Sequence, residues 1–416
     1  MKPKLWKYRF LIIANVVLIP GWLIGVFLAN TTSRDALANR DQYSENMYQE
    51  FPPREPSSFV LELEAWAESS DVYQLQYRLD RYLRQVFESG DRRVPDIPQD
   101  LQRYLNQNQA ELSQIRDRLA QEETLDFGLP YDVRNFSFST QFPNLSLLNR
   151  LSQLMMLRIL EHHQAGEINQ AEASFKAILN LNNSLEKNPD LLSQNTMERN
   201  YKNLLSLSRQ LDYLPETIAP KLEQAIATHQ TSNVFNLQFE TYFYSLAWTD
   251  NIIVEDASPM VQLLWLLARP YLSLIAAEVW KLENQLLGEM QTLDICRLTP
   301  QELLEVIPAT HWSFINDVER GEVLFQWWVR PQQLQFALEL SQNLQQIKDQ
   351  ARREGQFPEA IAPIPSSSCE ESQWVYEVNP DGTATIRLEN IPNLISEFGS
   401  PSYDTHHTIV TGFLAE

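Results

Sequence analysis

The chain has 416 residues, of which 44% are hydrophobic and 11% aromatic, enough to build the cores of two or three domains. This composition excludes an intrinsically disordered protein. Its 54 acidic and 33 basic side chains give a formal net charge of -21, so most of the surface should repel phosphate backbones. We therefore expect no nucleic acid among its partners.

The N-terminal region contains an uncharged apolar run at residues 10–29, FLIIANVVLIPGWLIGVFLA. At about 1.5 Å per helical residue this run reaches roughly the 30 Å thickness of a bilayer core, which predicts one transmembrane helix over residues 10–30, in contact with lipid. The segment ahead of it, residues 1–9, is basic and should stay in the cytoplasm. The rest of the chain should then lie in a periplasmic or lumenal space. The basic residues are Lys2, Lys4, Lys7 and Arg9.

Two features beside this run concern cleavage and dimerisation. The sequence ALA at residues 36–38 fits a signal-peptidase site, but the apolar run is longer than the core of a usual signal peptide, which favours a retained anchor. Gly21 and Gly25 have the G-x-x-x-G spacing that brings two membrane helices together, which predicts a weak homodimer contact. Residues 31–58 are polar and hold three prolines, which predicts a spacer.

Residues 59–328 have the pattern of a helical body. Apolar residues recur at helical spacing from Val60 to Val86, and a second helix is expected over residues 101–120. Residues 126–144 carry alternating aromatic side chains and predict an ordered loop clamped onto a core. Further helices are expected over residues 191–211 and 216–228.

Within the body, residues 164–179, QAGEINQAEASFKAIL, predict an antiparallel helical hairpin that covers residues 145–187. Gly166 allows the positive φ that ends the first helix, and Ala171 is small enough for the two helices to approach closely. Phe175 continues the apolar face of the second helix. These three residues form the candidate interaction site, and helix packing is the competing interpretation of the same pattern.

The most apolar part of the body is residues 234–287. Arg269 and Pro270 divide it, so neither half has the ~18 uncharged residues that a membrane span requires. A buried core helix is the favoured interpretation, and an interfacial membrane helix is the alternative. Trp265 and Trp280 would then be core residues.

Residues 329–416 change in character. A helix is expected over residues 331–353, where Gly355 suits a C-cap and Pro358 forbids continuation. The strands QWVYEV and TATIRL flank the turn NPDG, which predicts a β-hairpin. The predicted fold class is therefore mainly α, with a single N-terminal transmembrane helix, a body of helical hairpins and a small α/β C-terminal piece.

Signatures of common chemistry are missing from the sequence, including G-x-G-x-x-G, G-x-x-x-x-G-K-[ST], G-x-S-x-G, H-E-x-x-H and C-x-x-C. We therefore assign no catalytic residue, no cofactor and no metal ligand. His163 and Glu167 are four residues apart, but the turn at Gly166 lies between them. A second histidine pair, residues 406–407, would point to opposite faces of a strand. Solvated or capping histidines are the favoured interpretation.

The chain has two cysteines, Cys296 and Cys369. Outside the cytoplasm they could form a disulfide, and two separate thiols are the alternative, because the sequence does not show whether their Cα atoms come within bonding range. Glu370 and Glu371 beside Cys369 predict a solvated acidic loop.

The spacing of Gly166, Ala171 and Phe175 resembles that of a tetratricopeptide-repeat (TPR) hairpin, a fold that binds extended peptides or partner helices. A second copy at the ~34-residue period of such repeats is missing from the sequence. The resemblance therefore implies one TPR-like hairpin and no array.

A wider resemblance rests on the basic N-terminus, the anchor, the segment FPNLSLLNRLSQLMMLRILEHHQAGEINQAEASFKAIL and the segment GQFPEAI. Together they are similar to a group of uncharacterised bacterial membrane-anchored helical envelope proteins, which implies a place in the bacterial cytoplasmic (inner) membrane. The G-x-F-P of residues 355–358 also resembles the segment of type II secretion pseudopilins that leads from a long helix into a small sheet. Because ~300 residues separate the anchor from this helix, only the architecture carries over.

Three functions are compatible with these features. The leading prediction is a non-enzymatic interaction or scaffold factor for other membrane or envelope proteins. The second is a secretion or pilus-like assembly component, for which deletion of residues 331–416 should abolish assembly and leave the helical body folded. The third is a hydrolase or ligand sensor with an interhelical pocket, for which core packing is the competing interpretation. That pocket would lie near Phe235, Phe239, Tyr242 and Tyr244.

Overall fold

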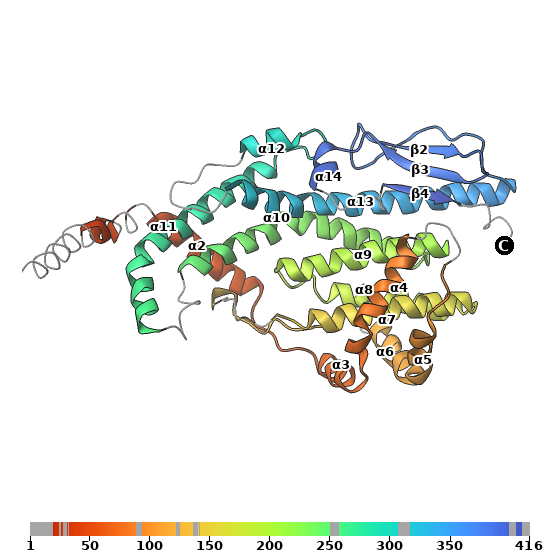
Figure 1. Ribbon diagram of the computed structural model, residues 1–416, viewed down its shortest axis with the longest axis horizontal. Helices are drawn as coiled ribbons and strands as arrows, with labels where there is room; N and C mark the ends of the chain where they lie inside the picture. Colours follow the sequence, from red (N-terminus) through yellow and green to blue (C-terminus); the bar gives the residue numbers. More distant parts are fainter. Residues whose placement is uncertain are drawn as a thin grey trace, which may run out of the picture.

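A computed structural model describes residues 20–24, 26–27, 31, 33–88, 94–121, 125–135, 140, 142–249, 258–306, 317–398 and 405–409 of the chain. The protein is mainly helical, with a small four-stranded antiparallel sheet near its C-terminus, as predicted in outline. Figure 1 shows long helices running side by side along the longest axis, with the sheet against α13 (Asp317–Glu354).

The other elements follow in chain order. The helices are α2 (Arg34–Glu50), α3 (Ser58–Ser69), η1 (Val72–Leu75), α4 (Gln76–Glu88), α5 (Gln99–Gln107), α6 (Gln109–Gln121), η2 (Val133–Asn135), α7 (Leu145–Gln164), α8 (Ile168–Asn183), α9 (Leu191–Leu211), α10 (Ala219–Thr249), α11 (Pro259–Met290), α12 (Pro300–Val306) and α14 (Asn393–Phe398). The strands are β1 (Ile364–Pro365), β2 (Gln373–Val378), β3 (Ala384–Glu389) and β4 (His406–Ile409).

The first core cluster joins α3 to α9 with the start of α10 and the middle of α13. Side-chain caps help to start three of its helices, because each cap oxygen accepts a hydrogen bond from a backbone N–H of the first turn. The caps are Ser57 for α3, Asn144 for α7 and Asp190 for α9. Helix α9 has the bounds that the sequence predicted.

Two turns divide helices that the sequence predicted as continuous. Asp71 has a φ of 55°, in the left-handed region, and separates α3 from η1 and α4. Asn108 separates α5 from α6, and its backbone N–H donates to the carbonyl of Tyr104. Apolar spacing continues through both turns, so periodicity alone did not reveal them.

The expected spacer, residues 31–58, contains α2, which packs onto the body. The Tyr242 hydroxyl donates to Ser44 Oγ at 2.7 Å, and Trp280 Nε1 donates to Asn39 Oδ1 at 3.1 Å. Met47 is 1% exposed in a cluster with Phe239 and Tyr242. The spacer prediction is therefore corrected: α2 is polar overall, but a narrow stripe of its side chains is buried.

The predicted transmembrane helix at residues 10–30 lies largely outside the described residues. Residues 20–24 and 26–27 are helical, and they expose Trp22, Leu23, Ile24 and Phe27. Within the described ranges, no helix has both the length and the apolar character needed to cross a bilayer. Segment 1–9 and Gly25 are also outside these ranges, so the Gly21 and Gly25 contact stays a prediction.

The apolar region 234–287 forms most of α10 and α11 and is only partly a core. Leu274, Ile275 and Trp280 in the second half of α11 are buried, as predicted for a core helix. The first half of α11 exposes large apolar side chains instead. The side chain of Trp265 lies outside the described part of the chain.

Helix α13 begins at Asp317, well before the predicted start, and continues through Pro331. It contributes Leu334 and Leu338 to the first core cluster, and Phe336 and Leu340 to a second cluster beneath the sheet. The boundary placed at residues 328–329 therefore falls inside a helix that both clusters share. Deleting residues 331–416 would remove part of the core of the body, so that deletion is not a clean test of assembly.

The predicted β-hairpin is confirmed, with its second strand one residue later than expected. Strands β2 and β3 pair in antiparallel register, with Trp374 opposite Leu388 and Tyr376 opposite Ile386. Gly382 closes the turn with a φ of 85°, and Gly355 ends α13 with a φ of 72°, both in the region that favours glycine. The sheet order is β1-β2-β3-β4.

Candidate functional site

The hairpin residues proposed for recognition lie inside the body. Helices α7 and α8 form the predicted hairpin, and Gly166 has a φ of 73° at the turn. Ala171 and Phe175 are both 0% exposed, and the Phe175 ring meets Tyr213 edge-on with centroids 6.2 Å apart. These positions favour the packing interpretation of the TPR-like pattern, because a partner could not reach either side chain.

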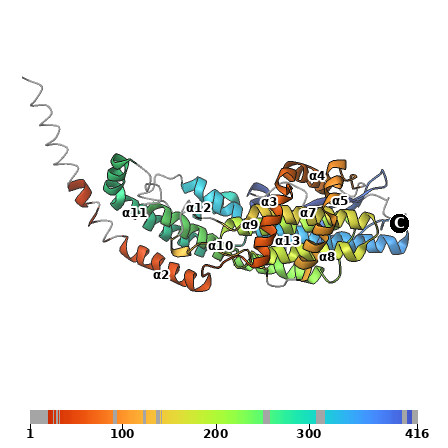
Figure 2. The same ribbon diagram turned by 90° about the horizontal axis from the view of Figure 1, so that it is seen from below.

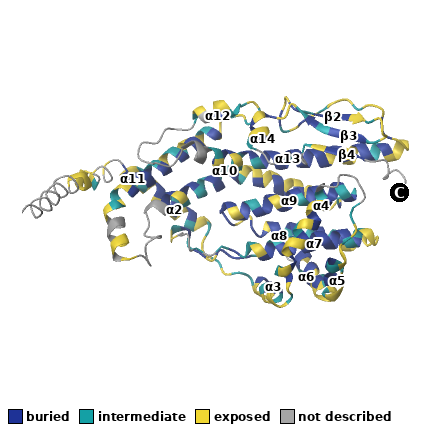
Figure 3. Cartoon of the chain, in the orientation of Figure 1, coloured by how far each residue is buried: buried dark blue, intermediate teal, exposed yellow. Residues whose placement is uncertain are grey.

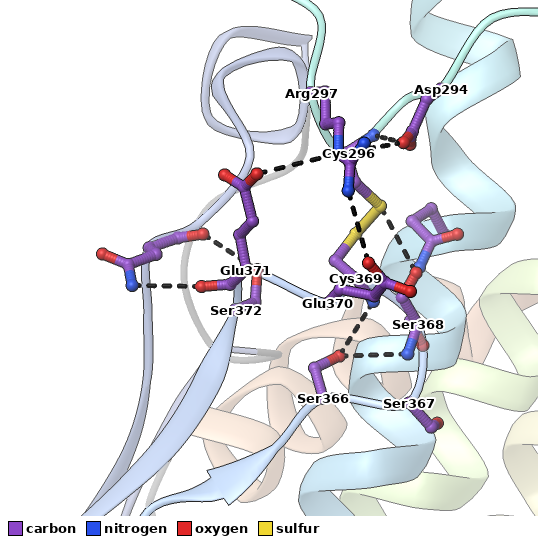
Figure 4. Close-up of a disulfide and its surroundings, with 12 residues drawn as sticks. Asp294, Cys296, Arg297, Ser366, Ser367, Ser368, Cys369, Glu370, Glu371 and Ser372 are labelled. Atoms are coloured by element: carbon purple, nitrogen blue, oxygen red, sulfur yellow. Dashed lines mark hydrogen bonds and ion pairs between the residues drawn. A yellow bond between two sulfur atoms is a disulfide. The ribbon is translucent and has the colours of Figure 1, made fainter.

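The two cysteines form a disulfide, so the alternative of two thiols is excluded. Cys296 follows α11 and Cys369 precedes β2, with Cα atoms 5.5 Å apart (Figure 4). Arg297 beside the bond pairs with Glu370 at 3.3 Å and with Glu371 at 3.6 Å. Glu370 and Glu371 are solvent-exposed, as predicted, and they also pair with a neighbouring cation across the disulfide.

Beneath the disulfide, Glu339 of α13 holds the loop that carries Cys369. Glu339 is 5% exposed, and its carboxylate accepts hydrogen bonds from Trp374 Nε1 at 2.9 Å and from three serine hydroxyls. The serine donors are Ser366 at 2.8 Å, Ser367 at 2.7 Å and Ser368. A buried carboxylate is tolerated when both oxygens are satisfied in this way. The arrangement fixes the loop and leaves Glu339 no evident role as a base.

A small cavity lies between the end of α9, the start of α10 and the second half of α13. Its volume is about 90 Å³, and two buried cations, Arg209 and Lys348, contribute to its wall. Arg209 Nη1 donates to the Ala337 carbonyl at 3.1 Å and to Ser341 Oγ at 2.9 Å. The full lining is Ser208, Arg209, Asp212, Tyr213, Leu214, Ala219, Glu223, Leu338, Ser341, Gln342, Leu344, Gln345 and Lys348.

Carboxylates offset the cations of this cavity. Asp212, at the C-cap of α9, lies 3.6 Å from Lys348 Nζ and also pairs with Arg352. Glu223 of α10 also lines the cavity and accepts a hydrogen bond from Gln342 Nε2 at 2.7 Å. The formal charges of the lining therefore cancel, so the cavity has no net positive charge that would favour binding of an anion. The hydroxyls of its two serines, Ser208 and Ser341, donate to backbone carbonyls of their own helices, so neither is hydrogen-bonded to a base. The cavity can hold water or a small polar molecule.

The histidine beside the hairpin turn that contacts Glu167 is His162, not His163. His162 Nδ1 lies 2.6 Å from Glu167 Oε2, and its Nε2 lies 3.3 Å from Arg116 Nη1. Because a guanidinium only donates, Nε2 accepts and Nδ1 carries the proton given to Glu167. Burial lowers the pKa of His162, although the hydrogen bond with Glu167 opposes this shift. The ring is a neutral connector between α6 and α7.

Potential metal ligands can be located over the described residues. In those ranges, no group of three or more His, Cys, Asp or Glu side chains is placed to hold a metal ion. His163 lies near Tyr213, with tilted rings whose centroids are 5.8 Å apart. His406 is exposed and His407 is buried, as predicted for neighbours on a strand.

The aromatic cluster proposed for an interhelical pocket is packed core. Phe239 and Tyr242 are each 1% exposed, and the Tyr242 ring meets Trp280 edge-on with centroids 6.3 Å apart. Phe235 is half-buried, and Tyr244 points outward with 42% exposure. The cavity described above lies apart from these side chains, between α9, α10 and α13.

Sequence reasoning missed both the cavity cations and Glu339. Arg209 and Lys348 interrupt apolar helix faces, which is a signal of buried charge that periodicity could have revealed. The serine run SSSC is visible in the sequence, but its acceptor lies 27 residues upstream of Ser366 on another element.

Comparisons with known protein families, with curated protein sequences and with solved structures found no match to this chain.

Proposed function

We propose that this chain is a single-pass, membrane-anchored protein whose body lies across the membrane from its basic N-terminus and binds other membrane or envelope proteins as a non-catalytic scaffold. The disulfide between Cys296 and Cys369 is the main support for a body outside the cytoplasm, because such bonds persist mainly in oxidising compartments. The uncharged run at residues 10–29, behind four basic residues, supports the same orientation.

The shape of the chain supports a scaffold. Figure 2 shows the described N-terminal residues at one end of an elongated body, with the long helices extending away from them. The buried polar groups Glu339, Arg209 and His162 are engaged in contacts between elements, which suits a rigid support. The hydrolase or sensor alternative has weaker support, because the cavity of about 90 Å³ is small, its lining is charge-balanced and its two serine hydroxyls donate to backbone carbonyls.

One observation favours the second candidate, a secretion or pilus-like assembly component. Helix α13 ends at Gly355 and leads through Phe357 and Pro358 into a four-stranded antiparallel sheet. Trp374 and Ile386 of that sheet share a core cluster with Phe336 and Leu340 of the same helix. A long helix backed by its own antiparallel sheet is the architecture that the pseudopilin resemblance implies.

Crosslinking of the full-length chain in its native membrane tests the proposal. The protein is crosslinked, extracted in mild detergent and purified, and the recovered proteins are identified by mass spectrometry. A partner that recurs at near-equal abundance is expected, and secretion subunits among the partners would favour the second candidate. A photoreactive residue placed at Tyr77, which is 75% exposed on α4, should capture the partner if it binds the body.

A photoreactive phenylalanine analogue at position 175 is the matched control. Because Phe175 is buried, the analogue should capture only this chain's own residues. Recovery of the protein alone, both from the crosslinked native membrane and from the photoreactive residue at Tyr77, would contradict the scaffold. Thermal stabilisation by a small molecule would then direct attention to the α9 and α13 cavity.

A further inference from the structure

The first half of α11 projects apolar side chains into solvent. Met260 is 68% exposed, Val261 45%, Leu267 50% and Tyr271 38%. From Leu272 onward the same helix is packed into the body, and Trp280 is 2% exposed. Figure 3 shows this change along α11, from exposed residues near its start to buried residues further on. Such a cluster on one short segment indicates a contact surface.

The charge of this segment differs from that of the chain. The chain carries a formal net charge of -21, but residues 258–277 contain no Asp or Glu, and Arg269 is their one charged residue. An apolar helical segment with a cation and no carboxylates matches the headgroup and acyl-chain boundary of a bilayer, where anionic lipids repel acidic side chains.

Helix α2 places this segment next to the predicted anchor. Asn39 contacts Trp280 at 3.1 Å, Arg40 contacts Ser245 at 3.4 Å and Ser44 contacts Tyr242 at 2.7 Å. Later residues of α2 therefore meet earlier residues of α10, so the two helices are antiparallel. Helices α10 and α11 are antiparallel as well, because Gln238 contacts Asn284 and the later residue Ser245 contacts Ala276. The start of α2 therefore points to the end of α10 and toward the first half of α11.

The distance along the chain between the apolar run and α2 is short. The run ends at Ala29 and α2 begins at Arg34, so four residues connect them. In both Figure 1 and Figure 2, residues 20–24 and the first half of α11 lie at the same end of the molecule. A bilayer that holds residues 10–30 would therefore lie within reach of α11.

Pro270 separates the two halves of α11. It lies inside the helix and has no N–H to donate to the preceding turn, which is a common cause of a bend. Figure 1 shows the first part of α11 turning aside at the end of the body, where the second part runs along α10. The bend lets the first half follow a surface at the end of the body while the second half stays packed.

We infer that the first half of α11, residues 259–271, lies in the interfacial region of the lipid bilayer and forms a second membrane contact beside the anchor. This inference rests on the anchor of the proposed function. Met260, Val261 and Leu267 enter the acyl-chain boundary, and Arg269 lies near lipid phosphates. Two contacts at one end of the body fix the orientation of the body on the membrane, which a single flexible tether would not do.

Depth-dependent quenching in the full-length protein tests this inference. Val261→Cys is labelled with an environment-sensitive fluorophore in the oxidised protein, whose two native cysteines are joined in the disulfide. The protein is reconstituted into vesicles of phosphatidylcholine and phosphatidylglycerol, with or without brominated acyl chains. Tyr77→Cys, on an exposed residue of α4, is the matched control. Quenching at position 261 should be several times that at position 77.

Flotation and carbonate extraction of the same samples test the anchor separately. Protein that floats and resists carbonate, but whose label at position 261 is quenched no more than at position 77, would overturn the α11 contact and leave the anchor standing. A shielded but unquenched label at position 261 would equally overturn it, because a protein would then cover the segment. Strong quenching in carbonate-extractable protein would support the α11 contact and remove the spanning anchor.

Discussion

At the level of single residues, the buried carboxylate of Glu339 accepts hydrogen bonds from four side chains. We predict that Glu339→Gln destabilises the protein by about 1–3 kcal/mol, because one carboxylate oxygen is replaced by an amide that donates and buried donors lose their acceptor. The donors are Ser366, Ser367, Ser368 and Trp374. The measurement is the free energy of unfolding by chemical denaturation.

Glu359→Gln is the matched control for this substitution. It makes the same chemical change at an exposed position just after α13, and it should alter the free energy of unfolding by no more than about 0.5 kcal/mol. If the two variants were equally stable, Glu339 would not be clamping the loop that carries Cys369.

His162 should make stability depend on pH. Its folded-state pKa is lowered by burial, so below the ordinary value of 6.5 the unfolded chain binds more protons than the folded chain. The stabilisation is therefore fully present above that value and declines as pH falls toward the lowered folded-state pKa. We predict that His162→Gln flattens the fall in unfolding free energy between neutral pH and about pH 5.

Two comparisons isolate this effect. His229 is also buried, and burial lowers its pKa too, so the wild-type profile contains both histidines. The difference between His162→Gln and wild type reports His162 alone. His229→Gln should remove the contribution of His229 and leave that of His162 in place. An unchanged slope in His162→Gln would show that His162 has the same pKa in both states.

At the level of elements, the disulfide ties the loop after α11 to the sheet. Its partners are 73 residues apart in sequence, so the bond removes a large loop from the unfolded ensemble. We predict that the double substitution Cys296→Ser and Cys369→Ser lowers the free energy of unfolding by about 2–4 kcal/mol. Denaturation curves of wild type with and without reductant provide the measurement.

The double variant is the control for side effects of the reductant. Its denaturation curve should be the same with and without reductant. Reduced wild type should then match the double variant. A wild-type curve that reductant leaves unchanged, under conditions where thiol titration shows full reduction, would contradict the stabilising role of the bond.

Elements with local start and stop signals were predictable from the sequence. Asp190 caps α9, Gly355 ends α13 and Gly382 closes the hairpin turn, and each of these signals lies directly beside the element that it bounds. Helix α2 was missed because its stability depends on contacts with α10 and α11, about 200 residues away. The hydrogen bonds of Glu339 could not be predicted from the sequence, and the pairing of the two cysteines stayed open. The reason is the same, because both features join distant segments of the chain.

At the level of the whole molecule, α13 connects the helical body to the sheet. Leu334 is 0% exposed in the cluster of α3 to α9, and Phe336 is 0% exposed in the cluster beneath the sheet. We predict that Leu334→Ala, which should cost about 2–5 kcal/mol, lowers amide protection in α7 to α9 and also in β2 and β3. Hydrogen exchange followed by mass spectrometry measures both regions in one experiment.

Leu394→Ala is the matched substitution on the other side of α13. Leu394 is also 0% exposed, but it belongs to α14 and to the cluster beneath the sheet. If α13 joins the helical body and the sheet into one cooperative unit, amides in both regions exchange through global unfolding. Either substitution should then lower amide protection in α7 to α9 and in β2 and β3. If Leu334→Ala left β2 and β3 fully protected, the sheet would unfold independently of the body.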